Sequence, residues 1–246
     1  YTRDHVLAEH KLDPDKIVSI PRGIDLERFN PSWVTPERVQ ALREAWGVEA
    51  RDRRVKLLLA GRLTRIKGHL LIIEAARRMR EDGVEDFLIL FAGDDQGRTG
   101  YREEVEAAIV AAGLSEHVRL VGHCDDMPAA YQICDIAMLP TTKPESFGRT
   151  AVEPQVMGKP VLASDHGGTT ETVLNGETGW LVKVDDPDAW ATAMGKAIDM
   201  GGPRLAAMGQ AAANRARRLY SVDAMCEATL DAYARVLAAR HAGSHG

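Results

Sequence analysis

Cysteine is scarce in this chain, with three among 246 residues. Cys124, Cys134 and Cys226 are odd in number, lie far apart and include no CxxC pair. This pattern supports neither a disulfide framework nor a zinc site. We therefore expect incidental or buried thiols in a reducing compartment.

The chain also lacks a basic excess and a long apolar run. Its formal net charge is −5, which argues against a nucleic-acid partner. No apolar stretch approaches the roughly 18 to 20 residues that span a bilayer, and the first residues have no signal-peptide pattern. We expect a cytoplasmic protein.

Hydrophobic residues make up 45% of the chain, enough for one large or two modest domains. Short apolar runs alternate with longer amphipathic ones, a pattern typical of strand–helix–strand units in a parallel sheet. Expected strands cover residues 17–20, 56–60, 87–92, 118–121, 136–139, 160–163 and 180–184. Expected helices cover residues 36–46, 68–80, 101–112, 127–134, 150–157, 169–174 and 187–199.

The strands at 56–60 and 87–92 are continuously apolar, as expected where helices cover both faces of the sheet. The sequence therefore predicts an α/β, doubly wound parallel sheet with helices on both faces. Helices at 205–219 and 222–239 close the chain, and residues 241–246 are expected to be disordered. Residues 1–12 are expected to form one helix.

The most informative segment, residues 144–153, holds two carboxylates, Glu145 and Glu153, around a glycine turn. A helix that begins near Gly148 or Arg149 offers free N–H groups to an anion, and the glutamates can accept hydrogen bonds from hydroxyls. Phosphate and sugar hydroxyls together describe a nucleotide-sugar. The alternative is a helix entered by a turn, with both glutamates as ordinary solvated acids.

A second segment, residues 61–68, follows a strand directly and precedes a helix. Arg62 and Lys67 therefore lie at the carboxyl edge of the sheet, where open α/β folds bind ligands. Arg62 can grip phosphate oxygens in a fork, and Lys67 adds a point charge beside a helix start. Two cations suit a diphosphate, although a loop with solvated charges has the same composition.

Further glycine turns follow other strands, at Gly93, at Gly122-His123 and at Gly167-Gly168. Glycine lets a planar base approach the backbone, and a glycine pair can offer N–H groups to a phosphate or sugar oxygen. The alternatives are a histidine without a ligand and a tight strand-to-helix turn. The histidines show no metal-ligand spacing, and the GxGxxG and GxxxxGK[ST] fingerprints are absent.

Taken together, these segments resemble the retaining glycosyltransferases of family 4. Residues 17–31 are similar to the linker of that family, and the likeness extends to about Val184. The motifs that carry it are Gly61-Arg62…Lys67-Gly68, Glu145-Ser146-Phe147-Gly148…Glu153, Gly158-Lys159-Pro160-Val161 and Gly167-Gly168…Glu171…Gly176…Gly179-Trp180-Leu181-Val182.

The resemblance implies a GT-B fold, in which two Rossmann-like domains face each other across a cleft and the C-terminal one holds the donor. It divides the chain into a residual helix and linker (1–31), a nucleotide-sugar-binding domain (32–220) and a C-terminal helix with tail (221–246). The N-terminal acceptor domain would be missing. The piece alone would then bind donor and catalyse little.

The resemblance also assigns roles to individual residues. It implies catalytic contributions from Arg62 and Lys67 on the donor diphosphate and from Glu145 on the sugar. Gly61 is implied in donor binding, with Gly122 and His123 near the base. The amides of Phe147 and Gly148 would hold the sugar, and those of Arg149 and Thr150 the phosphates. Glu153 would bind the ribose. Pro154 departs from the family pattern, and we expect a helix that is kinked or starts later.

The implied reaction is retaining transfer without a metal or cofactor, in the synthesis of a bacterial polysaccharide, lipopolysaccharide or glycolipid. The leaving phosphate oxygen would assist the acceptor's attack, with no covalent nucleophile. The resemblance leaves open a peripheral association of the full-length enzyme with the inner face of the membrane. Two other functions remain open: a non-catalytic nucleotide-sugar-binding module, and a nucleotide-sugar epimerase of similar architecture.

Overall fold

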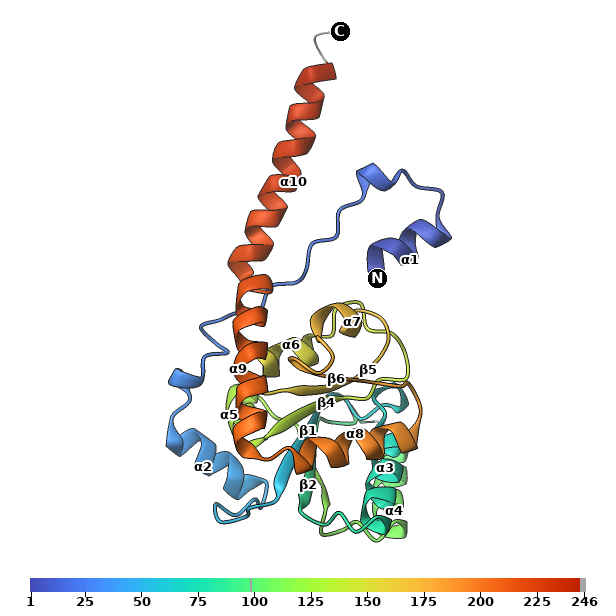
Figure 1. Cartoon of the computed structure of the whole chain (residues 1–246), viewed down its shortest axis with the longest axis vertical. Coiled ribbons are helices and arrows are strands. Elements are labelled where there is room, and N and C mark those ends of the chain that lie inside the picture. The colour runs from blue at the N-terminus through green and yellow to red at the C-terminus, as the bar shows by residue number, and fades with distance from the viewer. Residues whose placement is uncertain (98, 244–246) are drawn as a thin grey trace.

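The computed structural model describes residues 1–97 and 99–243, and its centre is one parallel sheet of six strands (Figure 1). The order across the sheet is β3-β2-β1-β4-β5-β6. The strands are β1 Val55–Ala60, β2 Phe87–Ala92, β3 Val118–Gly122, β4 Ile136–Leu139, β5 Val161–Ser164 and β6 Gly179–Val182. The doubly wound α/β prediction is confirmed.

The helices of the described residues follow the strands in alternation and then close the chain. They are α1 Thr2–Glu9, α2 Pro36–Ala45, α3 His69–Glu81, α4 Thr99–Ala111, α5 Met127–Ile133, α6 Arg149–Val156, α7 Thr169–Thr172, α8 Pro187–Asp199, α9 Gly202–Leu219 and α10 Val222–Gly243, with short 3-10 turns at Pro14–Lys16, Pro31–Trp33 and Arg65–Lys67. Capping side chains set some of the starts. Asp126 accepts the N–H of Ala129 at 3.1 Å, and Asp186 accepts that of Ala189 at 3.0 Å.

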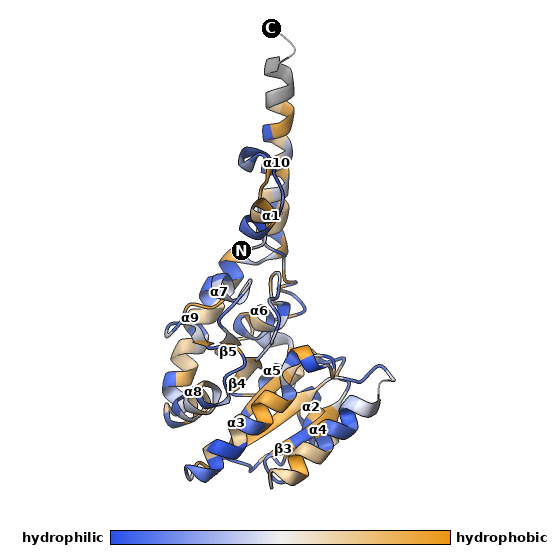
Figure 2. Cartoon of the chain, turned by 90° about the vertical axis from the view of Figure 1, so that its right-hand side faces the viewer, coloured by the Kyte–Doolittle hydropathy of each residue, from blue (hydrophilic) through white to orange (hydrophobic). Residues whose placement is uncertain are grey.

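The central strands bury side chains on both faces, which explains their continuous apolar runs. Leu57 and Leu59 pack in one cluster with Ile72 of α3, whereas Leu58 packs in another with Tyr131 of α5. Figure 2 shows the apolar strands behind α3, which carries both apolar and polar residues. Burial on two faces requires apolar residues at successive positions.

The strand order reverses direction between β1 and β4, and this switch brings two loops together. The loop after β1 and the loop after β4 are joined where the N–H of Thr142 donates to the carbonyl of Ile66 at 3.0 Å. Crevices at such a switch point are where open α/β sheets bind ligands. The two segments that the sequence singles out therefore lie side by side.

Several expected elements differ in the structure. Residues 17–20 are extended but pair with no strand, because no free sheet edge lies beside them and Pro21 follows; Val18 is 51% exposed. The first helix spans Thr2–Glu9 only. The last helix reaches Gly243, since strong helix formers continue past residue 237, so the expected disorder is wrong for residues 241–243, and residues 244–246 lie outside the described chain.

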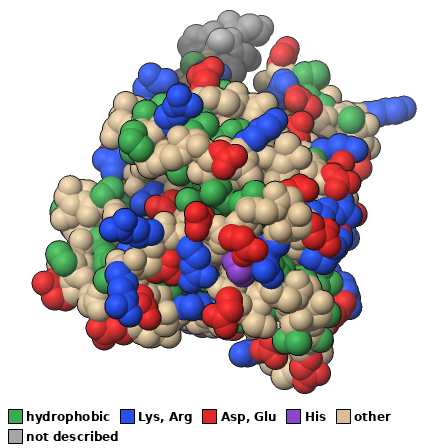
Figure 3. All heavy atoms as spheres, turned by 60° about the horizontal axis from the view of Figure 1, so that its bottom comes forward, with side chains coloured by type: hydrophobic (Ala, Val, Ile, Leu, Met, Phe, Trp, Pro, Cys, Tyr) green, Lys and Arg blue, Asp and Glu red, His purple; other side chains and the backbone are tan. Residues whose placement is uncertain are grey.

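Helix α10 extends away from the sheet, and α1 lies apart from it at the end of an extended segment (Figure 1). Within residues 1–97 and 99–243, no helix has both the length and the apolar character needed to cross a membrane. Acidic and basic side chains are interspersed over the face shown in Figure 3.

His69 opens α3 beneath the loop after β1 and makes stability depend on pH. Its ring is fully buried against Phe91 and Tyr101, with centroids 5.0 and 5.9 Å away. Burial lowers the pKa of His69 from 6.5 to about 4. Only the unfolded chain then takes up this proton between those two pH values, so the free energy of unfolding falls as the pH falls.

We expect this histidine to account for about 3 kcal/mol of stability lost between pH 7 and pH 4. The His69→Phe variant keeps the aromatic packing and should lack this part of the pH dependence. Urea unfolding at both pH values measures it, with the exposed His5→Gln variant as control. Equal pH dependence in wild type and His69→Phe would show that the ring is not held neutral.

Candidate functional site

A hollow of about 300 Å³ opens at the carboxyl edge of the sheet, and we call it the edge pocket. It gathers residues from the ends of the first three strands and from α5 and α6. Its lining consists of Ala60, Gly61, Arg62, Ala92, Gly93, Asp94, Gln96, His123, Cys124, Met127, Tyr131, Thr150 and Glu153. Five site residues predicted from the sequence therefore line one cavity: Gly61, Arg62, His123, Thr150 and Glu153.

Glycines allow the strand ends to close on one another at this pocket. A Cβ on Gly93 would lie 1.9 Å from the carbonyl oxygen of Gly61, which no side chain could accommodate. The N–H of Gly93 instead donates to the carbonyl of Gly122 at 2.8 Å. Gly122 does not line the pocket, but its φ of +77° turns the chain toward His123, and His123 does line it.

Glu153 is the most enclosed acid of the site, at 7% exposure. Its Oε2 accepts the hydroxyl of Tyr131 at 3.2 Å, and its Oε1 accepts Arg149 Nη2 at 2.9 Å. Burial raises the pKa of Glu153, and Arg149 and Tyr131 act in the opposite direction. The alternative of an ordinary solvated acid is wrong for this residue. Its carboxylate is positioned to accept hydroxyl donors in the pocket.

Tyr131 lines the edge pocket and bonds Glu153, and the sequence alone does not reveal it. It lies in α5 among apolar neighbours and is fully buried, so its pattern is that of a core residue. The single signal is a hydroxyl in a largely apolar helix, because a buried tyrosine hydroxyl needs a partner.

We expect Tyr131→Phe to lower the free energy of unfolding by about 1 to 3 kcal/mol at pH 7, because a hydrogen bond to a buried carboxylate is lost. Loss of this donor raises the pKa of Glu153 further. The folded variant then holds the proton to higher pH, so its stability falls more as the pH rises above 4.5. Urea unfolding should show a small deficit at pH 4 and a larger one at pH 7. Equal deficits at both pH values would contradict this assignment, and the exposed Tyr233→Phe variant is the control.

An ion pair stands beside the edge pocket. Lys67 Nζ lies 2.6 Å from Glu145 Oε1, and the two side chains are 15% and 29% exposed. The stem of Lys67 runs past Gly61, where an added Cβ would contact its Cδ at 3.4 Å. Arg62 has a weaker contact, 3.4 Å from Gln96 Oε1. Both predicted cations therefore lie at one edge of the sheet, with Arg62 the freer of the two.

Helix α6 begins at this site with unused donors. Gly148 is its left-handed N-cap, at φ +78°, and no side chain caps the helix. Across the described residues, the N–H groups of Arg149 and Thr150 have no acceptor. Such a helix start favours an anion. These two N–H groups are therefore available, and their binding of the donor phosphates stays a prediction.

The helix starts at Arg149, so the expectation of a later start because of Pro154 is wrong. Pro154 lacks only the N–H that would reach Thr150, and the helix continues with the N–H of Met157 bonded to the carbonyl of Glu153 at 3.1 Å. The carbonyl of Gly148 accepts the N–H of Ala151 at 2.8 Å, so the first turn forms without the N–H that Pro154 lacks.

In the glycine pair at 167 and 168, the N–H of Gly168 is used within the fold and is not free for a ligand. The N–H of Gly168 donates to the carbonyl of Glu145 at 2.7 Å, and a Cβ there would lie 2.6 Å from Ser146 O. The prediction of a free amide is wrong for Gly168, because this N–H bonds the loop after β4 at Glu145. The pair therefore positions Glu145.

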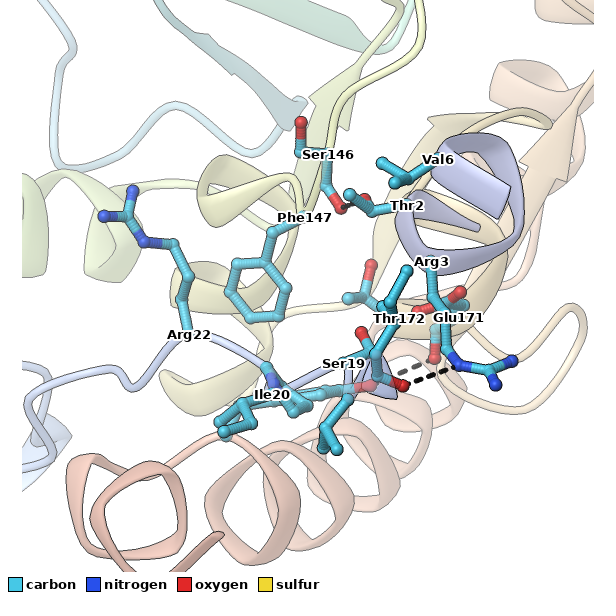
Figure 4. Close-up of a pocket in the computed structure, with 14 residues that line it drawn as sticks. Thr2, Arg3, Val6, Ser19, Ile20, Arg22, Ser146, Phe147, Glu171 and Thr172 are labelled. Atoms are coloured by element: carbon cyan, nitrogen blue, oxygen red, sulfur yellow. Dashed lines mark hydrogen bonds between the residues drawn. The ribbon is translucent and has the colours of Figure 1, made fainter. Parts of the chain in front are cut away.

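Phe147 does not line the edge pocket. Its ring stacks edge-on against Tyr220, with centroids 5.4 Å apart, and faces a second hollow of about 370 Å³ (Figure 4). This hollow lies between the body and α1, where Thr2 Oγ1 donates to the carbonyl of Ser146 at 3.2 Å.

Metal chemistry has no evident centre in the part of the chain that the structure describes, where no three His, Cys, Asp or Glu side chains cluster for an ion. The ring of His123 makes a polar contact with Asp125, with Nε2 2.9 Å from Oδ1. The charged groups in and beside the edge pocket include the cations Arg62 and Lys67 and the carboxylates of Asp94, Glu145 and Glu153, and free amides at the start of α6 stand with them.

Comparison with known proteins agrees with this geometry. Residues 43–215 match the family model described as glycosyl transferases group 1. D-inositol 3-phosphate glycosyltransferase of Salinispora tropica is 30% identical over 242 residues, which cover 95% of this chain and 49% of that protein. The chain spans about half the length of the curated relatives it matches.

Solved structures share the fold. A glycosyltransferase from Rickettsia africae ESF-5 has a TM-score of 0.90 and 30% identity, over 96% of this chain and 61% of that one. Anabaena HepE in complex with UDP-glucose has a TM-score of 0.75 and 25% identity, over 88% of this chain and 57% of that one. By sequence and by architecture, the chain belongs to the group 1 glycosyl transferases and has the fold of a GT-B glycosyltransferase domain.

Proposed function

We propose that the edge pocket binds the nucleoside diphosphate of a sugar donor, and that the whole protein transfers this sugar to an acceptor. The observation that carries the proposal is the convergence of Arg62, Thr150 and Glu153 on one pocket at the start of α6, next to the Lys67–Glu145 pair. A sugar nucleotide presents hydroxyls and a diphosphate together, which is the chemistry these groups recognise.

The donor can be placed group by group. Its base would lie against the glycine backbone near Gly122 and His123, and its ribose hydroxyls would donate to Glu153. Arg62, Lys67 and the amides of Arg149 and Thr150 would hold the diphosphate. The sugar would lie at Glu145 and the amides of Phe147 and Gly148. These assignments are the ones that the resemblance to family 4 implies, and the edge pocket supports them by gathering Arg62, His123, Thr150 and Glu153.

Departure of the nucleoside diphosphate builds negative charge on the phosphate. Fixed cations and helix amides stabilise that charge in the transition state, and in this proposal they do so without a metal or cofactor. Lys67 already lies in a polar pair, so little reorganisation precedes the reaction. Glu145 positions the sugar and forms no covalent bond with it.

We extend the proposal to retention of anomeric configuration, as in family 4, with the leaving phosphate oxygen assisting attack on the same face. Support comes from the order and spacing of the motifs. The acceptor domain would lie outside the matched half, and the pathway would be bacterial polysaccharide, lipopolysaccharide or glycolipid synthesis in the cytoplasm or at the inner face of the membrane. Nuclear magnetic resonance of the product made by a longer chain would report its configuration.

Calorimetric titration with UDP, GDP, ADP and UDP-glucose tests donor binding. UDP and UDP-glucose come first because HepE was solved with UDP-glucose. A ligand at a hundred times its Kd should add about 2.7 kcal/mol of stability. Lack of binding by every member of the panel would refute the proposal. Sugar transfer by a chain extended at its N-terminus would separate an enzyme from a non-catalytic module.

A further inference from the structure

A third hollow, of about 300 Å³, lies on the other side of the start of α6, and we call it the arginine hollow. It is formed by the segment that leads to α2, by the first turn of α6 and by the first turn of α10. The side chains that carry the argument are Arg22, Asp25, Arg28, Arg149, Val222 and Met225.

The walls of the arginine hollow are firmly built. Ile24 is 2% exposed and Phe29 3%, and the N–H of Ile24 donates to the carbonyl of Tyr220 at 2.7 Å. A Cβ on Gly23 would lie 2.6 Å from Val222 Cα, so the two segments are in direct contact. The shape of the hollow therefore depends on the packed core rather than on loose surface loops.

Positive charge outweighs negative charge in this hollow. Three guanidinium groups and one carboxylate, that of Asp25, line the hollow, and one of the three, that of Arg149, is paired with Glu153. Asp25 Oδ1 already accepts the N–H groups of Glu27 at 2.9 Å and Arg28 at 3.0 Å.

Two of the guanidinium groups have no carboxylate partner among residues 1–97 and 99–243, those of Arg22 and Arg28. The guanidinium of Arg28 donates to the carbonyl of Asp125 at 3.5 Å and lies over the ring of Phe29, 5.5 Å from its centroid, and its charge also acts on Asp126 and Glu153. Figure 4 shows Arg22 directed away from Thr2 and Glu171, with the ring of Phe147 between them. Unpaired arginines around a concave surface attract an anion.

The arginine hollow is separate from the edge pocket, although the two adjoin. Arg149 lines the hollow, Glu153 lines the pocket, and their ion pair at 2.9 Å stands between. Of the groups that we assign to the donor diphosphate, Arg62 and Thr150 line the edge pocket, whereas Arg149, assigned through its backbone amide, lines the arginine hollow. Because we place the donor diphosphate at the edge pocket, an anion in the hollow would belong to a different molecule or group.

We propose that the arginine hollow binds a phosphate group that is not part of the donor nucleotide. A phosphate has three terminal oxygens and can accept from several guanidinium forks at once, whereas a carboxylate satisfies one fork. The proposal rests on the proposed function only in placing the donor diphosphate elsewhere. The phosphate can come from a phosphorylated substrate or from free phosphate, since the chemistry is the same.

The test follows the arginine Nε–H resonances of the ¹⁵N-labelled chain during titration with inorganic phosphate and, separately, with glycerol 3-phosphate. We expect saturable shifts of the Arg22 and Arg28 signals, and at least about tenfold weaker phosphate binding in the Arg22→Gln/Arg28→Gln double variant. The matched control is Arg218→Gln, an exposed arginine outside the hollow. Binding of both probes points to a phosphorylated molecule, and binding of inorganic phosphate alone to the free anion.

Unchanged phosphate affinity in the double variant would overturn the proposal. So would shifts that vanish in Lys67→Ala but persist in the double variant, because the phosphate would then occupy the edge pocket. A parallel UDP titration of the wild-type chain keeps the two ideas apart: if UDP fails to bind while phosphate shifts Arg22 and Arg28, the proposed function fails and the phosphate site stands.

Discussion

The Lys67→Ala chain should bind UDP about ten- to a hundredfold more weakly than the wild type. Lys67 is only 15% exposed, and its ammonium lies 2.6 Å from Glu145. Its removal deletes a partly desolvated cation that would contact the diphosphate. It also leaves the Glu145 carboxylate uncompensated close to the negative ligand, so both effects act in the same direction. Calorimetric titration at fixed ionic strength measures the change.

The matched control for this variant is Lys143→Ala. Lys143 is an exposed lysine on the same loop as Glu145, so its loss changes the net charge equally without touching the ion pair. We expect UDP affinity close to that of the wild type. If Lys67→Ala and Lys143→Ala weaken binding equally, the effect is one of overall charge, and the diphosphate does not contact Lys67.

The Gly68→Ala substitution should lower the free energy of unfolding by about 2 to 5 kcal/mol. Gly68 has a φ of +75°, a conformation that side chains disfavour, and a Cβ there would lie 2.0 Å from the carbonyl oxygen of Pro140. Pro140 directly follows β4, so relief of the clash separates the loops after β1 and β4. We therefore expect weaker UDP binding in the fraction that remains folded. Urea unfolding and calorimetry report the two effects.

The comparison that isolates the clash is Gly83→Ala. Gly83 also has a positive φ, +85°, but a Cβ there would meet nothing within 4 Å. It should lose only the conformational part, about 1 to 2 kcal/mol, and should bind UDP normally. Equal losses in the two variants would mean that contact between the two loops adds nothing to stability.

The sequence predicted the sheet well because burial on two faces leaves a strong local mark. The run from Phe87 to Ala92 is apolar throughout and forms β2 with the same bounds. Residues 17–20 carry a similar local pattern, yet they remain unpaired. Strand formation needs a neighbouring edge, and no local pattern shows whether an edge is free.

The candidate site was predictable where the functional groups follow strands directly. Arg62, Lys67, Glu145 and Glu153 meet because parallel strands end at one edge. The role of the Tyr131 hydroxyl is not predictable from the sequence, because its contact with Glu153 depends on how α5 packs against α6. The arginine hollow draws on residues 22, 28 and 149, far apart in the chain, and only the folded structure brings them together.

The most direct test of this account is a crystal structure of the chain with bound UDP. The account predicts the uracil near His123, the ribose hydroxyls within hydrogen-bond distance of the Glu153 carboxylate, and the diphosphate on Arg62 and the first amides of α6. UDP bound outside the edge pocket, or bound there with Glu153 contacting no hydroxyl, would contradict it.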